Sequence, residues 1–175
     1  ATDTLDPAGV YFGTRNGKLY ASKDSGRSWH LAIDGLPSIT CVRAAVIADM
    51  LAHAREEAPR ECCGLLIGGE GEIERSVRAR NVDTRPARYL IDPGDHFAAI
   101  HAARSEGREV VGAYHSHPAS APVPSATDIA EANSGSEFLY VIVSPVGEEV
   151  RAYRCHDGKV FRILLQATGP SSFAT

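Results

Sequence analysis

The most informative stretch of the chain holds two histidines and an aspartate at spacings that suit a single metal ion. His115 and His117 stand two apart near the end of an expected strand, where alternate side chains share a face, so both imidazoles can reach one ion. Pro118 then takes the chain out of the sheet. Asp128 follows in the first turn of an expected helix, with Ser125 as its N-cap. Two imidazoles and one carboxylate leave a fourth zinc position open, which is typical of catalytic sites, where the metal activates water and polarises a carbonyl.

Each part of this pattern also has a purely structural interpretation. An H-x-H pair alone is weak evidence for a metal, and Ser125-x-x-Asp128 alone is a capping-box variant that stabilises the start of a helix. The combined string H-S-H-P-x7-S-x-x-D is far more restrictive, and its chance occurrence in 175 residues is improbable. The remaining histidines sit in no ligand-spaced cluster, and we expect surface or structural roles for His30, His53, His96, His101 and His156.

The composition bounds the class of protein. Apolar residues make up 43% and charged residues 23% of the chain, enough to bury the core of one ordinary domain, or of one domain with a short appendage. The formal net charge of -4 argues against the strongly basic surface of a nucleic-acid binder. No apolar run is long enough to span a membrane. The chain lacks a signal-peptide pattern and starts at Ala1 rather than Met, as a processed chain or part of a longer one would.

The four cysteines indicate a reducing compartment. Cys62 and Cys63 are adjacent and poorly placed to pair with each other. No C-x-x-C pattern joins them to Cys41 or Cys155. Buried apolar thiols are therefore favoured over a disulfide, and we expect a cytoplasmic protein.

The first forty residues differ in pattern from the rest. Short strand-like runs at 10–14 and 19–22 flank an Asn-Gly turn, and the octamer 22–29 matches the Asp-box pattern S-x-D-x-G-x-[ST]-W. This octamer resembles one blade element of BNR-type β-propellers, in which it stabilises a turn rather than catalysing a reaction. Asp24 can accept hydrogen bonds from backbone N–H groups in such a turn. Because one blade cannot bury its own faces, we predict that residues 1–40 are a β-hairpin remnant of a repeat domain.

Residues 41–166 alternate between helix and strand patterns that are typical of an α/β or α+β domain. We expect helices over 42–57, 93–106 and 125–133. We expect strands over 62–67, 72–79, 88–91, 109–115 and 138–144, then a hairpin of 150–155 and 160–164 with its turn at 157–158. These elements predict a mixed β-sheet flanked by helices, with the two histidines where one strand ends. The last residues, 167–175, are mostly small and polar, and we expect a loose tail.

The string H-S-H-P-x7-S-x-x-D, together with an upstream segment, resembles the JAMM (MPN+) metalloprotease family. Residues 58–68, A-P-R-E-C-C-G-L-L-I-G, are similar to the family segment P-x-E-x-C-G-[LI]-L-x-G. This alignment puts Glu61 at the position of the catalytic glutamate. By itself Glu61 would be interpreted as a surface charge, and its neighbours Glu56 and Glu57 fall outside the aligned position.

The resemblance implies an MPN-type fold and a role for each residue of the site. His115, His117 and Asp128 would ligate Zn²⁺. Glu61 would take a proton from the attacking water and deliver it to the leaving amine. Ser125 would hydrogen-bond the oxyanion of the tetrahedral intermediate.

The resemblance also implies the kind of substrate. The segments between the motifs are short, as in compact prokaryotic members, and relatives of that type cleave after the Gly-Gly tail of ubiquitin-like or sulfur-carrier proteins. It therefore implies a zinc-dependent (iso)peptidase, a hydrolase that takes such a protein as its partner. A sheet edge beside the metal would suit an extended tail by strand addition.

Two other functions stay open at this point. RadC-like domains carry a similar H-x-H-P string, but theirs starts H-N-H-P-S-G where this chain has H-S-H-P-A-S. A non-enzymatic MPN scaffold would keep the fold without the reaction. Metal analysis and a cleavage assay separate these functions, and the sequence leaves the oligomeric state undecided.

Overall fold

The computed structural model describes residues 10–14, 17–34, 39–69, 71–132, 138–156 and 158–168. Parts of several sequence predictions lie outside these residues: Asn16 of the first turn, Asn133 of the third helix, Asp157 of the last turn, and the tail from 169 onward.

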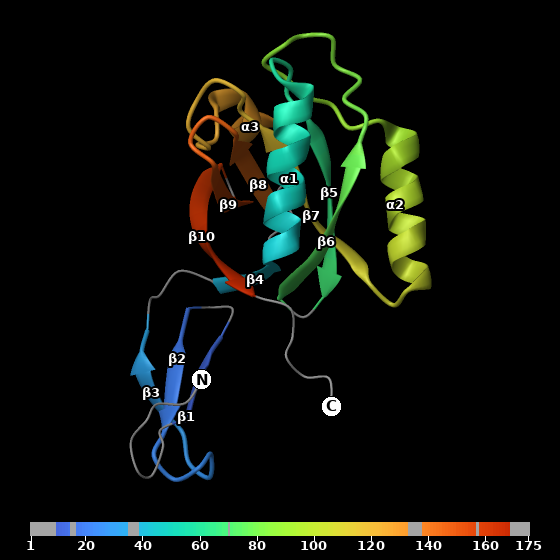
Figure 1. The fold of residues 1–175 in the computed structure, drawn as a ribbon. Coiled ribbons are helices and arrows are strands. Elements are labelled where there is room, and N and C mark those ends of the chain that lie inside the picture. Colours follow the sequence, from blue (N-terminus) through green and yellow to red (C-terminus); the bar gives the residue numbers. More distant parts are fainter. Residues whose placement is uncertain are drawn as a thin grey trace.

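Within the described residues the larger unit is a mixed β-barrel, closed in the strand order β10-β4-β6-β5-β7-β8-β9 (Figure 1). Its strands are β4 Ile39–Arg43, β5 Cys63–Gly69, β6 Glu72–Ala79, β7 Glu109–Ser116, β8 Leu139–Ser144, β9 Glu149–His156 and β10 Lys159–Thr168. The expected mixed sheet is confirmed, and β9 and β10 form the expected antiparallel hairpin. The closure of the sheet was not expected, and it depends on β4, which pairs in parallel with both β10 and β6.

Two expected elements differ from the structure. The helix expected from Val42 starts at Ala44, because the preceding residues extend as β4 between two neighbouring strands. The strand expected over 88–91 is wrong, since the segment forms only an isolated bridge between Asn81 and Ile91. Two backbone groups of this segment bond to a side chain instead of a strand. The Asn81 amide donates to the carbonyl of Arg88 and accepts from the N–H of Leu90.

Helices cover the outside of the barrel. They are α1 Ala44–Glu57, α2 Pro93–Ser105 and α3 Ala126–Glu131. α1 buries Val46, Met50 and Ala54, which recur every four residues and so share one face against the sheet. Among the described residues no helix is long and apolar enough to cross a membrane.

The core beneath α1 leaves no room for a side chain at Gly64. A Cβ there would come within 2.3 Å of the Tyr114 ring and 2.4 Å of the Val77 carbonyl oxygen. Tyr114 itself is fully buried, and its hydroxyl lies 2.8 Å from Nδ1 of His53 on α1. Gly64, the first glycine of the family-like segment 58–68, therefore has a packing role beside the strand that carries His115.

The strand registers define two ends of the barrel. Cys63 at the start of β5 pairs with His115 at the end of β7. At the opposite end Glu72 pairs with both Gly69 and Cys41. The two histidines thus lie at one end, and the chain enters the barrel through β4 at the other.

The N-terminal part forms a separate antiparallel sheet of β1 Val10–Gly13, β2 Leu19–Ser22 and β3 His30–Ile33. The Asp24 carboxylate accepts from the Ser22 hydroxyl and the Ser28 backbone N–H, each at 2.8 Å. Gly26 takes a φ of 88°, and the Trp29 indole N–H donates to its carbonyl at 3.1 Å. The turn therefore has the hydrogen bonding that the Asp-box pattern predicts.

Candidate metal centre

The end of β7 positions both histidines. His115 is nearly fully buried and pairs with β5 on one side and β8 on the other. His117 follows directly after β7, and its backbone N–H donates to the Val143 carbonyl at 2.8 Å, which keeps it beside β8. The chain then leaves the sheet at Pro118, as its missing N–H requires.

Asp128 reaches the same place from the first turn of α3. Ser125 and Asp128 form a capping box, in which the Ser125 hydroxyl accepts from the Asp128 N–H at 3.1 Å. In return the Ser125 N–H donates to Oδ2 of Asp128 at 2.7 Å. The structural interpretation of this S-x-x-D pattern is thus confirmed, and the same contacts aim the carboxylate at the histidines.

The ligand-type atoms of the three side chains lie within 4.8 Å of one another. Nε2 of His115 lies 3.2 Å from Nε2 of His117. Oδ1 and Oδ2 of Asp128 lie 3.4 Å from Nε2 of His115 and His117 respectively. Ligands bound to tetrahedral zinc at about 2.0–2.1 Å are about 3.3 Å apart. The closest atoms of each pair of side chains are near that separation, so the group is placed to hold one metal ion.

Further contacts orient these rings. Nδ1 of His117 lies 3.2 Å from the Ala121 carbonyl, so it carries the proton and leaves Nε2 free as a ligand atom. His115 stacks on Tyr89, with ring centroids 4.3 Å apart and an interplanar angle of 17°. The sequence analysis identified neither Ala121 nor Tyr89 as a partner of these rings. No local pattern marks Tyr89, because it lies outside any helix or strand.

The electrostatics favour the protonation states that metal binding needs at His115 and Asp128, but they favour the protonated form of His117. Burial lowers the pKa of His115, which keeps its imidazole neutral. For Asp128, burial opposes ionisation, but hydrogen bonds with His115 and His117 outweigh it and hold the pKa well below its usual range. Burial also acts against the charged form of His117, yet its contact with Asp128 raises the pKa of this imidazole. In the metal-free protein the anionic Asp128 is therefore hydrogen-bonded to a histidine.

Glu61 lies between α1 and β5 and is 7% exposed. Together with His117 and Ser125 it lines a cleft whose other walls are Pro59, Pro86, Ala87, Pro118, Ala119 and Ser120. Burial raises the pKa of Glu61 to about 7, against the opposing effect of His117. A carboxyl group that titrates near neutrality is suited to act as a general base.

Ser125 also faces this cleft, and its side chain is exposed. Its oxygen accepts from the Asp128 N–H, which leaves the hydroxyl hydrogen to donate to another group. Ser116, between the two histidines, has a different role. Its buried hydroxyl accepts from the Cys62 N–H at 2.9 Å, which ties β7 to the start of β5.

The raised pKa of Glu61 leads to a prediction about stability. The pKa of Glu61 is about 7 in the folded chain, compared with 4.5 for an unperturbed glutamate. The folded chain therefore binds the carboxyl proton more tightly than the unfolded chain does. The stability that Glu61 contributes to the metal-free protein is therefore present below about pH 4.5 and is lost as the pH rises through about 7. We expect Glu61→Gln, which is neutral at every pH, to raise the free energy of unfolding at pH 8 by about 1–2 kcal/mol. Urea unfolding with chelator should show this gain shrinking towards pH 4.5, and an equal gain at both pH values would contradict it.

Similarities to known proteins agree with this geometry. A family model described as prokaryotic homologs of the JAB domain matches residues 43–156. A CysO-cysteine peptidase of Mycobacterium tuberculosis is 36% identical over 131 residues, which are 72% of this chain and 89% of that protein. A desampylase of Haloferax volcanii is 41% identical over 122 residues, which are 62% of this chain and 86% of that protein.

A solved structure has a similar fold. The solution structure of a Desulfitobacterium hafniense protein superposes with a TM-score of 0.66 at 29% identity, covering 78% of this chain and 99% of that one. The resemblance inferred from the two sequence motifs is confirmed, and the chain belongs to the family of prokaryotic homologues of the JAB domain.

Proposed function

We propose that the protein is a zinc-dependent peptidase that hydrolyses the amide bond after the Gly-Gly tail of a ubiquitin-like or sulfur-carrier protein. The observation that carries the proposal is the convergence of His115, His117 and Asp128, whose closest atoms lie 3.2, 3.4 and 3.4 Å apart, near the separation of two ligands of tetrahedral zinc. These three residues would hold the ion. When bound, zinc would polarise the scissile carbonyl and acidify water.

The chain's own groups account for the rest of the reaction. Glu61 takes a proton from the attacking water and later gives it to the leaving amine, and its pKa of about 7 suits both transfers. The Ser125 hydroxyl donates to the developing oxyanion, because its oxygen already accepts from the Asp128 N–H and its hydrogen remains available. Ala121 and the Ser125 backbone hold His117 and Asp128 in place throughout.

The substrate class follows from the relatives. One is named as a CysO-cysteine peptidase and another as a desampylase, and both activities release a ubiquitin-like or sulfur-carrier protein from a conjugate. We further propose that the catalytic domain, expected over 41–166, takes in the whole of β4 and β10 and so runs from 39 to 168. The residues ahead of it are an appended Asp-box segment, and those after it are a tail. The four free cysteines support a reducing compartment such as the cytoplasm.

A cleavage assay tests this function. We expect the zinc-loaded protein to cleave a ubiquitin-like protein extended past Gly-Gly, with a single cut after the second glycine shown by mass spectrometry. Chelation should stop the reaction, and added zinc should restore it. A fusion whose tail ends in Ala-Ala is the matched control and should resist cleavage. Bound zinc without cleavage of any Gly-Gly fusion would instead support a non-enzymatic scaffold.

A further inference from the structure

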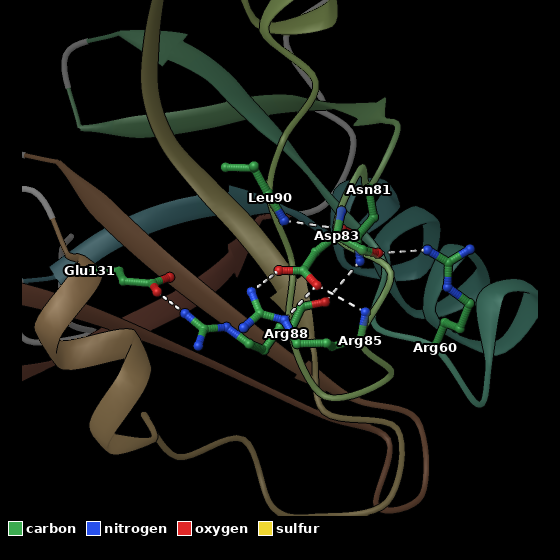
Figure 2. Close-up of polar contacts among 7 residues, drawn as sticks. All are labelled: Arg60, Asn81, Asp83, Arg85, Arg88, Leu90 and Glu131. Atoms are coloured by element: carbon green, nitrogen blue, oxygen red, sulfur yellow. Dashed lines mark hydrogen bonds and ion pairs between the residues drawn. The ribbon is translucent and has the colours of Figure 1, made fainter.

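The segment 81–91, which links β6 to α2, contacts several parts of the candidate site. Tyr89 stacks on His115, and Pro86 and Ala87 line the cleft that holds Glu61. The Pro86 carbonyl accepts from the Glu61 N–H at 3.3 Å. Arg88 forms an ion pair with Glu131 on α3, the helix that carries Asp128 (Figure 2). The path of this segment therefore influences both the metal ligands and the base.

One side chain makes four of the hydrogen bonds that hold this path. The Asn81 amide makes four hydrogen bonds, which use both N–H donors and both acceptor positions of its oxygen. Nδ2 donates to the Glu61 carbonyl at 2.9 Å and to the Arg88 carbonyl at 3.0 Å. Oδ1 accepts from the N–H groups of Asp83 and Leu90, each at 3.0 Å (Figure 2).

These bonds surround the residue that contacts a metal ligand. The Arg88 carbonyl and the Leu90 N–H belong to the residues on either side of Tyr89, so Asn81 holds the backbone there as a neighbouring strand would. Another of the four bonds goes to the backbone carbonyl of Glu61, the proposed base. The peptide groups of Glu61 thus bond to this segment on both sides, through Asn81 and through Pro86.

Other contacts of the segment are weaker candidates for this role. The Arg88–Glu131 pair has a side-chain exposure of 30% and 56%, and exposed ion pairs are weak because water screens them. Asp83 and Arg85 bond to each other within the loop and touch no residue of the metal cluster. Within the described residues, Asn81 is the side chain that joins the base segment to the ring stacked on His115.

We propose that Asn81 is a positioning residue. Through Tyr89 it fixes the orientation of the His115 imidazole, and through the Glu61 carbonyl it fixes the place of the base relative to the metal. The functional part of this proposal rests on the proposed zinc-peptidase activity. Its structural part, the stacking of Tyr89 on His115, does not.

The first test uses the metal-free protein. The Tyr89 ring should shift the imidazole proton resonances of His115 upfield in the NMR spectrum, and Tyr89→Ala identifies that shift. We expect Asn81→Ala to remove most of it and Leu90→Ala to preserve it, since the Leu90 side chain is 58% exposed and only its backbone meets Asn81. A wild-type ring shift in folded Asn81→Ala would overturn the proposal.

The second test measures the consequences for the site. Competition with a chromophoric chelator should show zinc bound about 10- to 100-fold more weakly by Asn81→Ala, the usual effect of losing a group that orients a ligand. In the Co²⁺-substituted protein the visible absorption bands should change. A double-mutant cycle should be non-additive, with Asn81→Ala adding little to the loss of zinc affinity in Tyr89→Ala.

Asn81→Asp covers the case in which the alanine variant does not fold. It keeps the size and both acceptor bonds but removes the donors to Glu61 and Arg88. We expect kcat to fall at least tenfold with circular dichroism unchanged, and an unchanged kcat would overturn the proposal. If the wild-type protein shows the ring shift and binds zinc but cleaves no fusion, the proposed peptidase activity fails while the positioning of His115 stands.

Discussion

Replacing Glu61 with glutamine is expected to lower kcat for cleavage of a Gly-Gly fusion by about 10²- to 10⁴-fold, the usual contribution of general acid–base catalysis. Glutamine keeps the size and burial of the side chain but cannot accept a proton from the attacking water. Because Glu61 is not one of the three clustered ligand-type residues, the variant should still bind about one zinc per chain. Single-turnover kinetics with metal analysis of the same sample measure both quantities.

The matched control is Glu57→Gln at the C-terminal end of α1. Glu57 is exposed and close to Glu61 in sequence, and it lines no part of the cleft. We expect its kcat to match that of the unmodified protein. Comparable losses of kcat in both variants would contradict a specific role of Glu61 as the base. They would show instead that negative charge in this region matters. An active Glu61→Gln would require another group to move the proton.

Asp128→Asn is expected to weaken zinc binding more than about 100-fold, beyond the effect of losing an orienting group. The substitution removes the proposed anionic ligand and the only formal negative charge among the three clustered side chains. The amide oxygen can still accept from the Ser125 N–H, so the start of α3 should stay capped. Chelator competition and metal analysis after gel filtration measure the loss.

Two variants separate ligation from other effects of this change. Asp24→Asn makes the same substitution in the Asp-box turn, on the separate N-terminal sheet, and should leave zinc affinity unchanged. Ser125→Ala removes the capping hydroxyl but keeps the carboxylate, so zinc should remain bound while catalysis falls. Wild-type zinc affinity in Asp128→Asn would mean that the metal, if any, is held elsewhere.

The grouping of His115, His117 and Asp128 could be predicted from sequence because its geometry is local. Alternation along a strand brings His115 and His117 together, and a helix N-terminus places Asp128 three residues after its cap. Glu61 needed the family resemblance, since a single glutamate beside a helix end carries no signal of its own. Its burial, which raises its pKa, depends on Pro86 and on packing that no local pattern encodes.

The parts that could not be predicted depend on contacts between distant segments. Closure of the barrel requires Ile39–Arg43 to pair in parallel with the end of β10, and five residues before a helix gave no sign of this. The contact between Tyr89 and His115 depends on the path of a loop. The side chain of Asn81 bonds to the backbone on both sides of Tyr89, where the residues 88–91 had suggested a short strand.

The placement of β4 has a consequence for how the protein can be joined to other molecules. The chain enters the barrel at Ile39, at the end where Cys41 pairs with Glu72, whereas His115 pairs with Cys63 at the other end (Figure 1). A fusion partner, or a surface used for immobilisation, linked ahead of this strand would therefore attach at the back of the barrel. The end of the barrel that carries the histidines would stay turned away from the attachment point, so the barrel is suited to tethering by its N-terminal side.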